Sequence, residues 1–168
     1  SVTYIGEYAF FQCGNLQTVN YNAQNCTYMG GAGGIGSIGG VFEGCASFNT
    51  LNIGNGVVSI PENAFHGCTQ LANVSIPNSV TAIHGYAFYN CSSISSITIG
   101  SAVSLIGDDA FGGCNSLTTI NYNAINCTNG DGSDSPFPWT SSALTTLNIG
   151  SGVQIIPMSL FKSCSHIN

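Results

Sequence analysis

Apolar residues recur along this chain with a period of 23 residues. Val57, Val80 and Val103 are each 23 positions apart, and the residues that follow them repeat one pattern. Written as a unit, the pattern is V-x-x-I-x-x-x-A-F-x-x-C-x-x-L-x-x-I-x-I, followed by three turn residues. A unit of this length cannot bury its own apolar side chains, so it has to stack on its neighbours. The period therefore predicts a solenoid.

The flanks keep this pattern with two insertions. Nine extra residues separate Cys13 from Cys45, and the unit between Leu117 and Leu144 is four residues longer than the regular one. The two irregular units begin alike, at residues 20–27 and 121–128, which are 101 positions apart. We expect residues 1–168 to form a single solenoid of about seven coils. Because the sequence starts and stops within a unit, we also expect it to be part of a longer chain.

Each unit ends in a segment that reads as a β-strand. In the unit that contains Leu71, the residues Asn73 to Ile76 alternate polar and apolar, which places Val74 and Ile76 inward and Asn73 and Ser75 outward. Stacked units align these strands as a parallel sheet with a spacing of about 4.8 Å per coil. Six such segments begin at Leu16, Phe48, Leu71, Ile94, Leu117 and Leu144.

The Ala-Phe-x-x-Cys part of each unit reads as one helical turn on the side opposite the sheet. Its Ala and Cys are small enough for coils to approach closely, and its Phe fills the space between layers. Glu7, Glu62 and Asp108 precede these turns, where a negative charge favours the start of a helix. The expected fold class is α/β, a right-handed solenoid with a parallel sheet on one face and short helical turns opposite.

The repeat resembles a known family. Residues 80–91, with the sequence VTAIHGYAFYNC, match the characteristic run of the Treponema pallidum-type leucine-rich repeat found in BspA-like surface proteins. The resemblance covers nearly the whole chain and implies a secreted or surface-displayed protein used in adhesion to host proteins or other cells. Cysteines replace the asparagine ladder of better-known leucine-rich repeats. A Gly-rich stretch at 29–34 and Thr140 or Ser141 at the usual cysteine position depart from the family unit.

The composition excludes two classes of partner. Only 5% of the residues are charged, the formal net charge is −6, and Lys162 is the one basic residue. Nucleic acids and anionic membrane surfaces require clustered Lys and Arg, so neither is an expected partner. No stretch approaches the roughly 20 apolar residues that span a bilayer. Ser, Thr and Asn make up 52 of the 168 residues and are expected to solvate the surface.

The regular cysteine column is expected to hold free, packed thiols rather than disulfides. Consecutive members lie within bonding range, but they point the same way, and buried thiols behave as small apolar residues. The column contains Cys13, Cys45, Cys68, Cys91, Cys114 and Cys164. Cys26 and Cys127 stand outside it, and the sequence assigns them no role. Zinc is not expected because no C-x-x-C pair occurs.

Other motifs carry little chemistry. The G-x-G-x-x-G at residues 34–39 lies in a glycine-dense insertion and reads as a surface loop rather than a dinucleotide site. Residues 129–134 resemble a calcium loop but lack the EF-hand Gly and Glu, so only a weak site of another kind stays open. Trp139 is expected to cover the coil edge after this loop. The histidines His66, His84 and His166 form no column with a nucleophile, so we expect no catalysis and no cofactor.

Two outward-facing columns of the predicted strands are the candidate binding surface. They give a broad, uncharged face with donors and acceptors at regular intervals, although solubility and strand compatibility alone also explain them. Aromatic anchors are missing, so the affinity of each coil is expected to be low. The columns are Thr18, Thr50, Asn73, Ser96, Thr119 and Thr146, and then Asn20, Asn52, Ser75, Thr98, Asn121 and Asn148.

These features favour a non-catalytic, extracellular or cell-surface segment for adhesion or ligand binding. The expected partner is a protein or glycan of a host or neighbouring cell. The alternative is a structural spacer or surface-layer element that holds other domains away from the cell. Exposed coil ends are also expected to stack on one another, which predicts end-to-end self-association.

Overall fold

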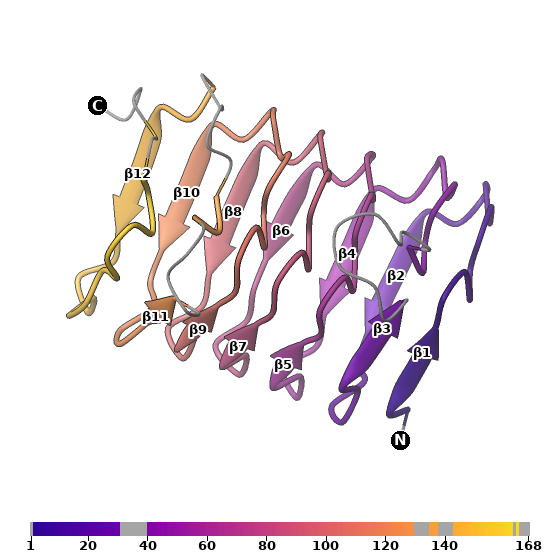
Figure 1. Ribbon diagram of the computed structural model, residues 1–168, viewed down its shortest axis with the longest axis horizontal. Helices are drawn as coiled ribbons and strands as arrows, with labels where there is room; N and C mark the ends of the chain where they lie inside the picture. The colour runs from indigo at the N-terminus through magenta and orange to yellow at the C-terminus, as the bar shows by residue number, and fades with distance from the viewer. Residues whose placement is uncertain (1, 31–39, 130–134, 138–142, 163, 165–168) are drawn as a thin grey trace.

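The computed structural model describes residues 2–30, 40–129, 135–137, 143–162 and 164. The chain winds into a solenoid in which each coil contributes one strand to a main parallel sheet (Figure 1). Within that sheet β2 pairs with β4, and the strands β6, β8, β10 and β12 pair in that order. The main-sheet strands are β2 (Thr18–Tyr21), β4 (Thr50–Ile53), β6 (Asn73–Ser75), β8 (Ser96–Ile99), β10 (Thr119–Tyr122) and β12 (Thr146–Ile149).

The register of the main sheet follows the sequence period. Ile97 of β8 lies beside Val74 of β6, 23 residues earlier, and beside Ile120 of β10, 23 residues later. Where the sequence has an insertion, the offset grows with it, so Thr18 pairs with Thr50. The predicted stacking of equivalent residues is confirmed.

A second parallel sheet runs along another side of the solenoid, and the sequence analysis did not predict it. It forms from the Val-x-x-Ile part of each unit, where Leu105 and Ile106 pair with Ala82 and Ile83. Here β1 pairs with β3, and β5, β7, β9 and β11 pair in sequence order. The strands are β1 (Tyr4–Gly6), β3 (Tyr28–Gly30), β5 (Ser59–Ile60), β7 (Ala82–Ile83), β9 (Leu105–Ile106) and β11 (Thr128–Asn129).

The predicted helical turns are wrong, because the described residues contain no helix. The Ala-Phe-x-x-Cys segments are successive β-turns, in which Tyr89 N–H donates to the Tyr86 carbonyl and Cys91 N–H to the Phe88 carbonyl. Tyr86 and Asn90 have φ values of 56° and 58°, which is the left-handed region, and a right-handed helix cannot contain such residues. The residue before the cysteine is therefore often glycine, as at Gly67. Since the described residues contain no helix, the prediction that Glu7, Glu62 and Asp108 stabilise helix starts is also wrong.

A column of stacked phenylalanine rings runs through the core. Neighbouring ring centroids are 5.2–5.3 Å apart except between Phe42 and Phe65, where the distance is 5.9 Å. Phe137 continues the column in the second irregular unit and is fully buried. The column contains Phe10, Phe42, Phe65, Phe88, Phe111, Phe137 and Phe161.

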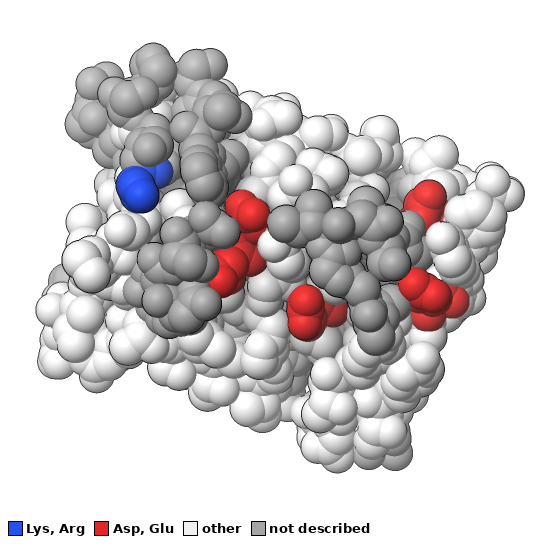
Figure 2. Space-filling model, in the orientation of Figure 1, with Lys and Arg blue, Asp and Glu red and all other residues white. Residues whose placement is uncertain are grey.

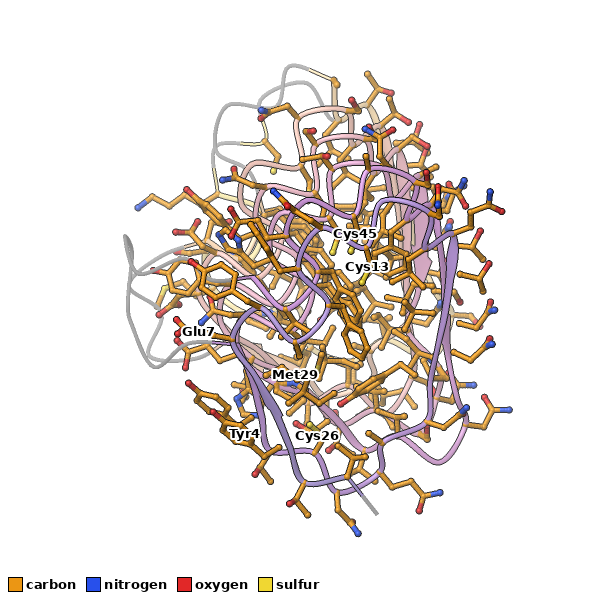
Figure 3. The ribbon with its side chains drawn as sticks, turned by 90° about the vertical axis from the view of Figure 1, so that its right-hand side faces the viewer. Tyr4, Glu7, Cys13, Cys26, Met29 and Cys45 are labelled. Carbon is orange, nitrogen blue, oxygen red and sulfur yellow. The ribbon has the colours of Figure 1, made fainter. Side chains whose placement is uncertain are left out.

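The eight cysteines are free, and most of the regular column is buried as predicted. Cys45, Cys68, Cys91 and Cys114 lie in the core, whereas Cys164 is half-buried. The prediction is wrong for Cys13, which is exposed because no coil of the described residues covers it on its N-terminal side. Figure 3 shows Cys13 next to Cys45 at that end.

Candidate functional site

The outer face of the main sheet presents the two predicted polar columns side by side. Strand alternation buries Ile97 and Ile120 and turns the residues on either side of them outward. Of the twelve predicted residues, Ser96, Thr98, Thr119 and Asn121 are half-buried and the other eight are exposed. None of the twelve is buried, and none is charged.

Asparagine side chains in the second column bond to one another from coil to coil. Asn52 Nδ2 donates to Asn20 Oδ1 at 2.8 Å, and Asn148 Nδ2 donates to Asn121 Oδ1 at 2.8 Å. Asn121 Nδ2 in turn donates to Thr98 Oγ1 at 3.2 Å. These bonds hold the amides in one orientation before a ligand arrives, which lowers the entropy lost on binding.

A shallow depression of about 680 Å³ adjoins this face where strands β6, β8 and β10 end. Ser75 and Thr98 of the predicted columns line it, together with the turn residues Asn55, Asn78 and Asn123. Asn78 and Asn123 bond to the Ser101 N–H and the Ile99 carbonyl, respectively, which fixes their positions. The alternation of polar and apolar residues did not predict this depression, because it concerns strand positions only. The asparagines one to three positions after the strand ends, Asn55, Asn78 and Asn123, are the signal that could have indicated it.

The described acidic residues lie away from the strand columns, in the turns that follow the second sheet. Figure 2 shows them on one face of the molecule, with Lys162 near one end. Glu7 likewise points away from the main sheet in Figure 3. The candidate surface is therefore electrically neutral, and its contacts with a ligand have to be hydrogen bonds and packing. The described acidic residues are Glu7, Glu43, Glu62, Asp108 and Asp109.

Comparison with known proteins gives the family. The sequence matches the BspA type leucine rich repeat region, in six copies, over residues 1–32 and 39–168. The chain belongs to the BspA-type leucine-rich repeat family. None of the curated proteins compared matches it.

Two bacterial crystal structures are similar to this BspA-type chain. One is the T. pallidum leucine-rich repeat protein, with a TM-score of 0.51 and 20% identity, over 98% of this chain and 76% of that one. The other is a leucine-rich repeat protein from Eubacterium ventriosum, with a TM-score of 0.57 and 23% identity, over 94% of this chain and 36% of that one. At these identities the likeness establishes the leucine-rich repeat fold, while the count of about seven coils and the right-handed winding remain predictions.

The buried thiols of the BspA-type coils are poor nucleophiles. Burial raises the pKa of the Cys91 and Cys114 thiols, so both stay protonated at neutral pH. Their Sγ atoms donate to the carbonyls of Phe65 and Phe88, two coil-spanning bonds of 3.1 and 3.3 Å. Their arrangement supports a packing role.

Cys26 and Cys127, which the sequence left unassigned, occupy equivalent places in the two irregular units. Both are buried, and each thiol donates to a nearby main-chain carbonyl at 3.3 Å. The neighbouring tyrosine hydroxyls, Tyr21 and Tyr122, have pKa values raised by burial and further by these thiols. In each irregular unit a tyrosine and a cysteine therefore lie together in the core.

Thiol labelling tests this assignment. In the folded protein we expect iodoacetamide to modify the exposed Cys13 rapidly and to leave Cys91 and Cys114 unmodified, because a buried, protonated thiol cannot attack the reagent. Peptide mass spectrometry measures each site, and labelling in guanidinium chloride provides the control in which all sites react. Equal labelling of Cys13 and Cys91 in the native state would contradict the buried column.

The described residues show no metal centre and no membrane-spanning helix. No three His, Cys, Asp or Glu side chains among them are grouped so as to hold an ion. No helix in the described part of the chain is long and apolar enough to cross a bilayer. The glycine-rich 34–39 motif, His166, Trp139 and most of the calcium-like 129–134 segment lie outside the described residues. His66 lies in the turns, stacked on Tyr89, and burial lowers its pKa.

The first coil carries a second, apolar hollow of about 730 Å³ at the end of the stack. Val2, Ile5, Phe10, Val19 and Phe42 line it. Inside the solenoid the corresponding side chains are covered by the next coil. This surface is the one on which the predicted end-to-end stacking would depend.

Proposed function

We propose that this BspA-type segment is a non-catalytic scaffold that binds a partner protein through the outer face of its main sheet, outside the cell or at its surface. The observation that carries the proposal is the neutral, two-column face, in which amides are held in register by bonds such as Asn148 to Asn121. The family supports a binding role, because extended repeat surfaces commonly recognise other macromolecules.

Binding to immobilised extracellular-matrix proteins tests the proposal. The triple variant Asn52→Ala, Thr98→Ala, Asn121→Ala removes hydrogen-bonding groups from three coils of the face. Each lost bond contributes about 0.5–1.5 kcal/mol, so we expect Kd to rise at least about tenfold. Biolayer interferometry against a panel of matrix proteins measures the change.

The second sheet provides the matched control. Thr81, Ser104 and Thr128 are exposed hydroxyl residues in three successive coils, and each bonds to the preceding coil as the face residues do. Their triple alanine variant is expected to bind like the original protein. Light scattering before each measurement separates partner binding from end-to-end stacking of the chain.

The outcomes distinguish the alternatives. Binding that both triple variants retain overturns the strand face as the site. Binding to a neutral-glycan array in place of the matrix proteins changes the partner class to a glycan. An original protein that binds neither panel favours the structural-spacer role.

A further inference from the structure

The main sheet is interrupted between β4 and β6. Elsewhere neighbouring strands exchange backbone hydrogen bonds, as when Ser95 N–H donates to the Ala72 carbonyl and Ile76 N–H to the Thr98 carbonyl, both at 2.8 Å. Among the described residues of β4 and β6 no such bond joins the two strands, and they do not pair. β2 and β4 form one hydrogen-bonded block, and β6 to β12 form another.

The same interruption occurs in the turns between these coils. Phe65 N–H donates to the Ala87 carbonyl at 2.8 Å, and Phe10 N–H donates to the Val41 carbonyl at 3.0 Å. No backbone bond in the described part of the chain joins residues 40–45 to residues 62–68. The second sheet also has no pairing of β3 with β5. We call this break, between the coil that ends in β4 and the coil that ends in β6, the seam.

Thiol bonds follow the same division. Cys45, Cys91 and Cys114 each donate to the phenylalanine carbonyl of the preceding coil. Between the described residues Cys68 and Phe42, across the seam, the equivalent bond is missing, as it also is between Cys164 and Phe137 in the last coil. Strands, turns and cysteines therefore all lose their coil-to-coil bonds at one level of the stack.

Apolar packing across the seam is also looser. The Phe42 and Phe65 rings are 5.9 Å apart, the widest spacing in the aromatic column. Leu51 and Ile53 of β4 are half-buried, whereas Ile97 and Ile120 in the paired strands are fully buried. Beyond the covalent connection at residues 54–56, apolar packing holds the blocks together, including the stacking of Phe42 on Phe65 and the edge-on packing of Tyr21 against Phe65.

A proline accounts for part of the seam. At the position after the main-sheet segment, Gly54, Asn123 and Gly150 donate their N–H to the preceding coil, at distances of 2.9, 3.2 and 2.9 Å, whereas Gly100 makes no such backbone bond to a described residue. The equivalent residue of the coil at the seam is Pro77, which has no N–H to donate. The sequence thus removes a ladder bond at the level where the other bonds are also missing.

We infer that the described residues before the seam, 2–30 and 40–54, form one cooperative unit that opens away from the rest of the solenoid at the seam. In a stacked repeat, stability is the sum of coil stabilities and nearest-neighbour contacts, so the weakest contact sets where the stack divides. The seam also divides the proposed binding face between Asn52 and Ser75. Opening changes the angle between two rigid polar blocks, which lets one face fit partners of different curvature.

Native-state hydrogen exchange measured by mass spectrometry tests the inference on the full chain. Peptides covering β2 and β4 are expected to exchange at the same rate, and at least tenfold faster than peptides covering β8. Ordinary fraying from the end of a stack gives a different result, in which β2 exchanges faster than β4 and protection rises gradually along the coils. Such a gradual rise, or equal protection on both sides of the seam, would overturn the inference.

A proline substitution gives a second, independent readout. Pro77→Ala restores an N–H at the seam, and one added hydrogen bond is expected to slow exchange across β2 and β4 about fivefold. Pro157→Ala, in the last coil, is the matched control and is expected to leave that exchange unchanged. If both substitutions have the same effect on β2 and β4, the missing ladder bond is not what weakens this level. The inference then depends only on the difference in exchange rate between β4 and β8 that is measured in the original protein.

Discussion

Replacing Phe88 with alanine is expected to lower the free energy of unfolding by about 3–5 kcal/mol, which is typical for a large aromatic residue removed from a packed core. Phe88 is fully buried between Phe65 and Phe111, at ring distances of 5.3 and 5.2 Å. A loss of this size is a large part of the 5–15 kcal/mol that keeps most domains folded. Urea unfolding followed by circular dichroism measures it.

Phe10→Ala is the control for this change. The Phe10 ring stacks on Phe42 alone in the aromatic column and is 42% exposed, so its removal leaves little cavity. We expect a loss of about 1 kcal/mol. A cost for Phe88→Ala no greater than that for Phe10→Ala would show that the aromatic column does not hold the coils together.

The cavity at Phe88 should also change how the protein unfolds. In a stack where each coil contacts only its neighbours, a weak level in the middle separates the coils on its two sides. The variant is therefore expected to unfold over a wider range of urea than the original protein, or in two steps.

Periodicity determined most of the fold from the sequence alone, because it directly gives the spacing of stacked residues. The 23-residue offset between Val74 and Ile97 and the 32-residue offset between Val19 and Leu51 are both pairs in the sheet. Alternation within each strand likewise predicted which residues face outward. These predictions required counting positions and did not depend on the local backbone conformation.

The turns could not be predicted in the same way, because their conformation depends on backbone angles that side-chain type only weakly specifies. Tyr8, Asn63, Tyr86 and Asp109 all adopt positive φ, yet only asparagine and aspartate among these residue types favour it. A spacing of three to four residues between apolar positions fits both one helical turn and a pair of β-turns. The glycines before several cysteines were the signal in the sequence that favoured a pair of turns over a helical turn.

The seam also escaped the sequence analysis, since it is a difference between coils that look alike in sequence. Pro77 accounts for one missing bond, but a proline at a turn is ordinary and does not by itself predict an unpaired strand. The seam becomes visible only in the structure, where β4, Cys68 and the turns lack bonds at the same level of the stack. Repeat sequences therefore predict the average coil better than the exceptions that divide the stack.

The cysteine column connects the fold to a second large effect, which depends on pH. Raising the pH above about 8.5, the pKa of an unfolded cysteine, is expected to destabilise the protein steeply. Burial raises the pKa of Cys91 and Cys114 in the folded state, so folded thiols keep protons that unfolded thiols release. The folded state then binds more protons than the unfolded state, and stability falls as the pH rises.

Each of these two thiols contributes up to about 1.4 kcal/mol per pH unit once the unfolded thiol is fully ionised, so the pair lowers the free energy of unfolding by roughly 2.4 kcal/mol between pH 9 and pH 10. Urea unfolding in the presence of a reducing agent, from pH 7 to pH 10, measures the slope, to which the tyrosines of the unfolded chain add as they begin to ionise near pH 10. The double variant Cys91→Ala, Cys114→Ala is expected to be less stable at pH 7 but to lose stability more slowly above pH 8.5. A slope that is the same in both proteins would mean that these thiols are not buried in their protonated form.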